Sequence, residues 1–385
     1  MIMPRMTRGF AILAAVTIVF ACAASGGAAN VTPPHGTVAY FLHGSKNLYL
    51  GLAPLEGGAT RLVRLPSGGP EALEFSSDGS TVSFLVRPGG ARLHRGTYYV
   101  VDTASLRVRR VLSSQKLGPG IMAVSRAPTN RVAVVHKVFS PHSSCRGRSW
   151  ISIVDEGGAT HRLPDLPLAA RQTASRTVFI DEISWSADGR SVAVTVKRFD
   201  DPGDCRLNEY GSSSLFRLPA SGRGKALQLR HSALFLGVAS WSSDARAIAY
   251  VEWHLDQANL FVVRPNGEGR QALTHFGRSD EPFLSYVWSG PTSIVAVHEP
   301  HDQSQSARLY KIDVAQASST EVAVLSESRG VYAANRDVTV VATSASELLT
   351  ISLADGATRG HTRLMSPRTG LQLDDYDPVA VSLAR

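Results

Sequence analysis

Two short segments of the 385-residue chain concentrate side chains that could bind a metal ion or move a proton. FDDPGDCRLNE (Phe199–Glu209) carries four carboxylates, and HEPHD (His298–Asp302) carries two imidazoles and two carboxylates. Clusters of oxygen ligands suit calcium or magnesium, and paired imidazoles suit transition metals. The same groups could serve as a general base and the residue that orients it. Neither segment has the ligand spacing of a defined metal site, so their chemistry depends on how the fold places them.

A sequence pattern repeated along the chain predicts the elements that hold these segments. FIDEISWSADGRSVAVTV (Phe179–Val196) places an aromatic residue, a serine and an Asp-Gly turn between two alternating apolar runs, which is typical of a β-hairpin. LEFSSDGSTVSFLV (Leu73–Val86) and VASWSSDARAIAYV (Val238–Val251) repeat it closely. Fainter copies start at Gly120, Leu284 and Gly330, while residues 30–42 keep only the second run. The unit is about 50 residues long, and we interpret its Ser and Asp-Gly as turn chemistry rather than catalysis.

Each unit continues with a third apolar strand, a Gly-rich turn and a fourth strand, so the fold class is all-β with four antiparallel strands per unit. No segment after the N-terminal region has the pattern of an amphipathic helix. The first unit lacks its first strand, and the chain ends on an isolated strand in DPVAVSLAR (Asp377–Arg385). Because a ring of sheets leaves fewer exposed edges than a row, we predict a seven-bladed β-propeller closed by this C-terminal strand beside Thr37–Leu42. A six-bladed ring is the alternative.

The repeat resembles that of the TolB-like propellers, whose blades read as an apolar strand, Trp-Ser-Pro-Asp-Gly and a second apolar strand. The match is ISWSADGRSVAVTV and its copies, with Ala187 or Ser243 at the proline position and Ala245 after Asp244 in place of glycine. The resemblance covers the predicted domain, residues 30–385. It implies an exported propeller that binds a ligand, and we expect the N-terminal α/β domain of TolB to be absent.

The N-terminal 29 residues have the order of a secretory signal peptide. MIMPRMTR contains two arginines and no acid, an apolar run of 13 residues follows (Gly9–Ala21), and small residues come next. The run is shorter than the roughly 20 residues of a membrane-spanning helix. Two processing routes stay open: lipidation after cleavage before Cys22, in the lipobox-like VFAC, or ordinary signal-peptidase cleavage. We expect a secreted protein or a lipoprotein at the outer face of the cytoplasmic membrane.

The loops between the second and third strands of all blades fall on one face of a propeller, which we call the loop-rich face. They hold seven of the chain's 12 histidines and many of its acids. Because loops carry function on rigid scaffolds, this face is the predicted ligand- or partner-binding surface, with these candidate residues: His136, His142, Asp200, Asp201, Asp204, Glu209, His254, Asp256, His298, Glu299, His301 and Asp302.

These features favour a non-enzymatic binding or scaffold protein for a protein or cell-envelope ligand. The alternative is a propeller-type lyase or hydrolase that uses the His- and acid-rich face. No catalytic residue is assigned, and the sequence has no G-x-S-x-G nucleophile elbow. The net charge of +8 is spread along the chain, which does not indicate nucleic-acid binding. We expect a monomer without a cofactor, with calcium or another divalent cation as the alternative, and membrane contact only through a lipid anchor.

A disulfide between Cys145 and Cys205 is the first testable prediction. Cys22 lies in the signal region, which leaves these two of the three cysteines, and disulfides persist outside the cytoplasm. The two residues belong to corresponding loops of neighbouring blades, which could bring them within the Cα separation of about 4.4–6.8 Å that a disulfide needs. Closing roughly 60 residues would contribute about 4 kcal/mol. Intact-mass measurement after alkylation without reductant should show no labelled thiol at either position, and two labelled thiols would disprove the bond.

Overall fold

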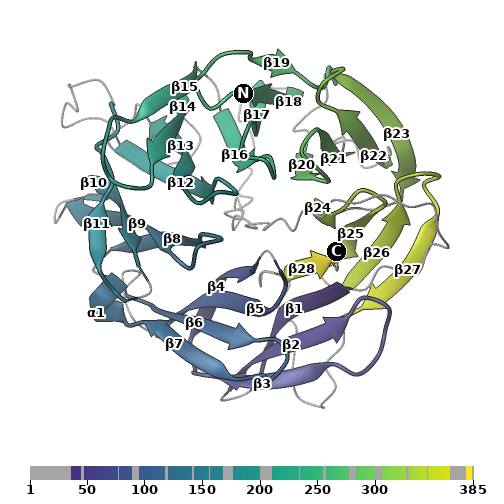
Figure 1. Cartoon of the computed structure of the whole chain (residues 1–385), viewed down its shortest axis with the longest axis horizontal. Coiled ribbons are helices and arrows are strands. Elements are labelled where there is room, and N and C mark those ends of the chain that lie inside the picture. The colour runs from purple at the N-terminus through teal and green to yellow at the C-terminus, as the bar shows by residue number, and fades with distance from the viewer. Residues whose placement is uncertain are drawn as a thin grey trace, which may run out of the picture.

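Seven four-stranded antiparallel sheets are arranged around a central axis in the computed structural model, as blades of a propeller (Figure 1). The residues that the structure describes are 36–44, 47–76, 78–88, 95–117, 120–140, 143–155, 157–167, 177–199, 210–233, 235–254, 257–276, 283–299, 306–326, 328, 330–344, 346–364 and 379–383. The predicted seven-bladed, all-β fold is confirmed over these residues.

The strands follow one another from the axis outward within each blade. Blade 1 contains β28 (Val379–Leu383), β1 (Gly36–His43), β2 (Leu48–Pro54) and β3 (Arg61–Leu65), and blade 2 contains β4 (Gly69–Phe75), β5 (Thr81–Arg87), β6 (Thr97–Asp102) and β7 (Val108–Leu112). Blade 3 contains β8 (Ile121–Arg126), β9 (Val132–Ser140), β10 (Ser143–Val154) and β11 (Thr160–Arg162), and blade 4 contains β12 (Thr177–Trp185), β13 (Ser191–Phe199), β14 (Tyr210–Pro219) and β15 (Leu227–Ser232).

The remaining three blades have the same order. Blade 5 contains β16 (Phe235–Trp241), β17 (Ile248–His254), β18 (Gln257–Val263) and β19 (Gln271–Ala272), and blade 6 contains β20 (Phe283–Trp288), β21 (Ser293–Glu299), β22 (Ala307–Asp313) and β23 (Ser318–Leu325). Blade 7 contains β24 (Gly330–Ala334), β25 (Val338–Ser344), β26 (Glu347–Ser352) and β27 (Thr358–Arg363). One helical turn, α1 (Ser114–Leu117), connects blades 2 and 3. Among the described residues, no helix has the length and apolar character needed to cross a bilayer.

The apolar core lies in the seams, by which we mean the contact surfaces between neighbouring blades. Successive residues of a strand point to opposite faces of its sheet, so the second strand of a blade contributes to two seams at once. On β21, Ile294 and Ala296 pack against blade 5, whereas Val295 and Val297 pack against blade 7. This explains why the second strands read as nearly continuous apolar runs in the sequence.

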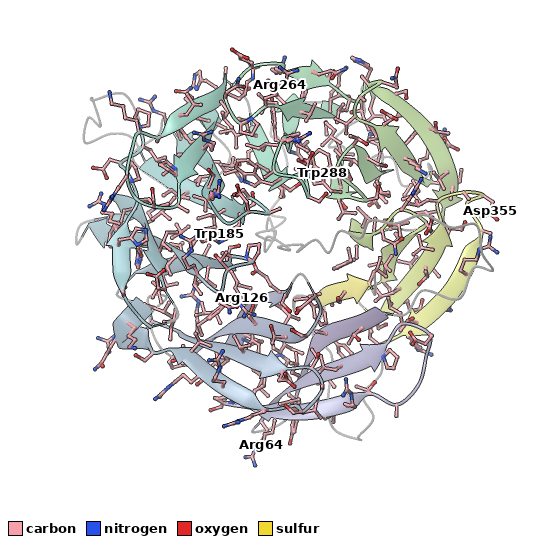
Figure 2. The ribbon with its side chains drawn as sticks, viewed as in Figure 1. Arg64, Arg126, Trp185, Arg264, Trp288 and Asp355 are labelled. Carbon is pink, nitrogen blue, oxygen red and sulfur yellow. The ribbon has the colours of Figure 1, made fainter. Side chains whose placement is uncertain are left out.

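The aromatic residue before the turn ties one blade to the previous one. Trp185 Nε1 donates to the carbonyl of Ser125 at 3.1 Å, and Trp288 Nε1 donates to the carbonyl of Ser240 at 3.2 Å. Figure 2 shows both tryptophans toward the inner part of the ring, while Arg64 and Asp355 lie at its outer rim. At Trp185 and Trp288, the indole N–H is therefore used in contacts between blades, whereas Trp241 Nε1 is buried without a hydrogen-bond partner among the described residues.

The Ser and Asp of the repeat stabilise the turn between first and second strands. Ser76 Oγ donates to Asp78 Oδ1 at 2.6 Å, and the same oxygen accepts from the backbone and side chain of Ser80. These hydrogen bonds lower the pKa of Asp78 to about 2. The next position is left-handed, with φ of 69° at Gly79 and 58° at Ala245, so the alanine keeps the turn at some cost in backbone strain.

The predicted closure of the ring is confirmed. β28 pairs antiparallel with β1 from Gly36↔Leu383 to Tyr40↔Val379. Val381 and Leu383 are buried in a cluster that also contains Val338 and Val340 of blade 7. The C-terminal strand thus completes blade 1 and supplies part of the seam between blades 7 and 1.

Deletion of residues 377–385 should therefore lower the thermal unfolding midpoint severely, because blade 1 would lose its inner strand. The milder change Val381→Ala should cost about 2 kcal/mol of unfolding free energy, since it leaves a cavity in that cluster. Val324→Ala is the matched control: Val324 is 59% exposed, and its change should stay within about 0.5 kcal/mol. A truncated protein that melts like the parent would contradict the closure.

Candidate functional site

Two sets of connecting segments between strands lie on the loop-rich face. The chain passes from second to third strand there, for example between β13 and β14, and it also leaves each fourth strand there to start the next blade, as between β19 and β20. The candidate residues predicted from the sequence belong to the first set. Phe276, which follows β19, shows that the second set also contributes side chains to this face.

Most of the predicted site residues lie outside the described residues: His142, Asp200, Asp201, Asp204, Glu209, Asp256, His301, Asp302, Cys22, Cys205 and the whole signal region. Cys145 and His254 are placed by their backbone, and both lie in strands, β10 and β17, where the sequence analysis expected loops. The proposed disulfide and the lipidation of Cys22 therefore stay predictions.

His136 is buried between blades 2 and 3, where only 3% of its surface is exposed. Its ring is stacked on Trp150, with centroids 4.8 Å apart and an angle of 9° between the planes. Nε2 lies 2.6 Å from Ser152 Oγ. This imidazole is oriented by its neighbours and stabilises the seam.

His298 is the last buried residue of β21 and faces blade 5, with 8% of its surface exposed. Its ring stacks on Phe276, with centroids 4.2 Å apart, and Phe276 in turn contacts Tyr310 at 5.0 Å. Burial and then the charge of Arg308 lower the pKa of His298, so the imidazole is neutral at pH 7. His136 and His298 thus belong to different seams, and the structure does not bring them together.

A second aromatic group lies at the loop-rich ends of blades 4 and 5. Lys197 Nζ is 3.7 Å from the centroid of the Phe235 ring, and Phe235 contacts Trp253 with centroids 6.1 Å apart. Cation–π contacts of this kind are strongest where the cation is partly desolvated. Lys197 and Trp253 occupy the same place in their repeats, six residues after Ser191 and Ala247 respectively. Alignment of the repeats by position could have found both residues.

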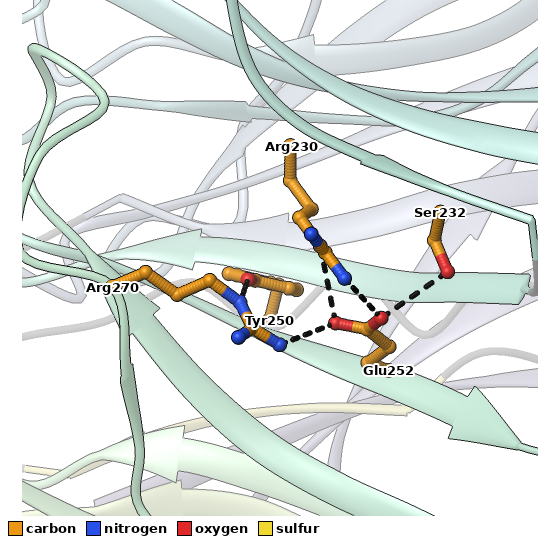
Figure 3. A network of polar contacts seen from close by, with 5 residues as sticks. All are labelled: Arg230, Ser232, Tyr250, Glu252 and Arg270. Atoms are coloured by element: carbon orange, nitrogen blue, oxygen red, sulfur yellow. Dashed lines mark hydrogen bonds and ion pairs between the residues drawn. The ribbon is translucent and has the colours of Figure 1, made fainter.

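Glu252 is the centre of a polar network between blades 4 and 5 (Figure 3). Arg230 of β15 donates to it from Nη2 at 2.7 Å and from Nε at 3.3 Å, and Arg270 donates from Nη2 at 2.9 Å. The carboxylate is only 2% exposed. Burial opposes its ionisation, but the hydrogen bonds and charges of both arginines outweigh burial and keep the pKa of Glu252 below its ordinary value. No local sequence pattern predicts this network, because its members are distant in sequence.

Two other buried groups titrate away from their usual ranges. Lys137, beside His136, is 1% exposed, and burial lowers its pKa to about 7. Glu74 of β4 is also 1% exposed, and burial raises its pKa to about 8, although its Oε2 accepts a hydrogen bond from the backbone N–H of Arg126 at 2.9 Å. Glu74 is therefore mostly protonated at pH 7.

The described part of the chain contains no group of three or more His, Cys, Asp and Glu side chains that could hold a metal ion. The two segments that suggested a metal in the sequence lie mainly outside that part: only Phe199, His298 and Glu299 of them belong to it.

Solved structures of similar fold come from several functional classes. Oligogalacturonate lyase in complex with manganese is 13% identical, with 75% of each chain covered and a TM-score of 0.57. The β-propeller domain of the Trilobed protease from Pyrococcus furiosus is 14% identical, with 86% of this chain and 94% of that chain covered and a TM-score of 0.53. TolB from Acinetobacter baumannii is 16% identical, with 76% and 65% covered and a TM-score of 0.43.

No model of a known protein family matches the sequence, and no curated protein matches it either. Since the lyase and the Trilobed protease domain are below 25% identity, their similarity shows the propeller fold alone.

The raised pKa of Glu74 predicts a specific pH dependence of stability. Between its ordinary value of 4.5 and about 8, the unfolded chain loses the Glu74 proton while the folded chain keeps it. The contribution of Glu74 to stability is therefore complete below 4.5, falls as pH rises through this window and becomes constant above about 8. Glu74→Gln cannot ionise, and Gln can still accept the N–H of Arg126.

Urea midpoints of the parent and of Glu74→Gln, measured from about pH 5 to about pH 9, should diverge in favour of the variant as pH rises to about 8. Lys137 titrates in the same range but is present in both proteins, so its effect cancels. Parallel curves would show that Glu74 is not protonated in the folded state.

Proposed function

We propose that this chain is a non-enzymatic extracytoplasmic binding protein whose loop-rich face, at blades 4 to 6, holds a protein or cell-envelope ligand. The observation that carries the proposal is the pair of aromatic groups at that end of the blades. One is Lys197, Phe235 and Trp253, and the other is Phe276, His298 and Tyr310. Export and lipidation at Cys22 rest on the N-terminal sequence alone.

Both groups have the properties of binding hot spots. Phe235, Trp253, Phe276 and Tyr310 are neither fully buried nor fully exposed, so each ring keeps apolar surface for a partner. Contacts between the rings, stacked for Phe276 on His298 and tilted for the other two pairs, fix the rings in advance, which reduces the entropy that a ligand must overcome. Aromatic residues and arginine carry most of the binding energy at protein interfaces. Arg230 and Arg270 lie in the seam between blades 4 and 5, and their side chains are 33% and 39% exposed.

A propeller-type lyase or hydrolase is the alternative function. It would need His and acid groups that converge within about 3 Å of a reacting atom. Of the candidate histidines from the sequence, His136 and His298 have described side chains, and they lie in separate seams. A divalent cation at the face belongs to this alternative and is not required for binding.

Truncation of the aromatic group that contains Phe276, His298 and Tyr310 tests the proposal. The purified chain should capture a ligand from envelope extract, and the variant Phe276→Ala with Tyr310→Ala should bind the identified ligand at least about tenfold more weakly, as expected for a loss of about 1.4 kcal/mol or more. Tyr49→Ala is the matched control, because Tyr49 is also a half-buried aromatic residue but lies on blade 1. Equal binding by the double variant and the parent would contradict the proposal.

A further inference from the structure

The seam between blades 4 and 5 contains an excess of arginine. Arg217 of β14 and Arg230 of β15 project from blade 4 toward blade 5. Arg217 pairs with Ala193, which packs against blade 5, and Arg230 contacts Glu252 of that blade. Arg270, just before β19, projects from blade 5. Among the described residues, Glu252 is the carboxylate that forms ion pairs with Arg230 and Arg270. These three arginines therefore carry more positive charge than the carboxylate of Glu252 can balance.

The network around Glu252 fixes the directions of two guanidinium groups. Arg230, Arg270 and Ser232 converge on the carboxylate, with Ser232 Oγ donating at 3.2 Å (Figure 3). Arg270 Nε also donates to Tyr250 Oη at 3.0 Å, and its guanidinium lies 4.1 Å from the centroid of the Phe261 ring. Such restraints mean that little ordering would be needed when a ligand binds.

These contacts leave donors of both arginines available. A guanidinium has five N–H donors, and the bonds to Glu252 and Tyr250 use Nε and Nη2 of each residue but not Nη1. The side chains of Arg230 and Arg270 are 33% and 39% exposed, so both keep surface in contact with solvent.

Arg217 supplies an independent indication of a missing partner. Its Nε is fully shielded from solvent and makes no hydrogen bond within the described part of the chain. A buried donor on a charged group is costly when it stays unsatisfied. An anion that enters the seam would satisfy it and would also compensate the excess of positive charge.

We propose that this seam binds an oxyanion of the ligand, a carboxylate or a phosphate, through Arg217, Arg230 and Arg270. The inference deepens the proposed binding function and rests on it, because Glu252 directly precedes Trp253, a member of one of the aromatic groups, at the loop-rich end of β17. Arginine suits this class of ligand, since its planar fork forms paired hydrogen bonds with carboxylate and phosphate oxygens. Glu252 acts as the positioning residue that orients the guanidinium groups of Arg230 and Arg270.

Titration calorimetry with inorganic phosphate and, separately, with succinate tests this site in the purified chain, at constant ionic strength with chloride as the balancing anion. We expect saturable binding of at least one anion, and which of the two binds more tightly distinguishes a phosphate from a carboxylate source. Arg217→Gln should weaken binding at least fivefold while leaving the contacts of Glu252 intact, and Arg270→Gln should weaken it further. Circular dichroism confirms that each variant is folded.

Arg359→Gln is the matched control, because the Arg359 side chain is also 39% exposed and forms an ion pair with Asp355 on blade 7. Its affinity for either anion should stay within twofold of the parent. Absence of saturable binding in the parent, or an equal loss in Arg217→Gln and Arg359→Gln, would overturn the inference. The titration needs no captured ligand, so its result is independent of the test of the proposed function. If no anion binds but the aromatic variant still loses the captured ligand, the anion site alone is refuted. If an anion binds but the aromatic variant keeps the captured ligand, the proposed function alone is refuted.

Discussion

The pairing of β28 with β1 is the interaction on which the rest of the structure depends. Each blade is a thin sheet with apolar residues on both faces, so it cannot be stable unless a neighbour covers each face. A ring meets this condition only if its two ends are joined, and the five paired positions from Gly36↔Leu383 to Tyr40↔Val379 join them. Every seam, including those that hold the proposed binding residues, is positioned by that closure.

The seams change character along their length, and this change locates the candidate site. The middle of each second strand is apolar because both of its faces are covered, as for Ile294 and Val295 on β21. At the loop-rich end, the second strands continue into Glu252, His298 and Lys197. Glu252 and His298 are buried there, but they contact Arg230, Arg270 and Phe276, which keep exposed surface for water or a ligand. The buried ion pairs of Glu252 are costly to desolvate and strongly destabilising to break, which favours a single orientation for the arginines.

The sequence predicts the repeat-based features well and the contacts between blades poorly. Strands, turns, blade number and closure follow from local patterns, such as Ser76-x-Asp78 or the isolated C-terminal run, because local hydrogen bonds and alternation determine them. The contact of Arg230 with Glu252 depends on two strands of different blades and on the irregular register of β14 with β15 between Leu215 and Phe216. No local pattern encodes that geometry.

The location of the loop-rich face could be predicted from the sequence, but the surroundings of its side chains could not. Its position followed from the order of strands. His298 was expected in a loop and His136 at the end of a strand, and both are buried strand residues, stacked on Phe276 and Trp150 respectively. Histidine has both an apolar ring and polar nitrogens, so its residue type alone does not distinguish a seam from an exposed loop. Phe276 could not be anticipated, because a single aromatic residue in a connecting segment has no periodic signal.

Hydrogen–deuterium exchange of the purified chain, with and without its captured ligand, tests the central claim most directly. The account predicts that the ligand slows exchange at the loop-rich ends of blades 4 to 6, in the peptides around β15, β17 and β21 and in the segment that follows β19. It predicts no change at the turns of Asp78, Asp188 and Asp244, which lie on the opposite face. Protection of those turns, or of blades 1 to 3 alone, would contradict it.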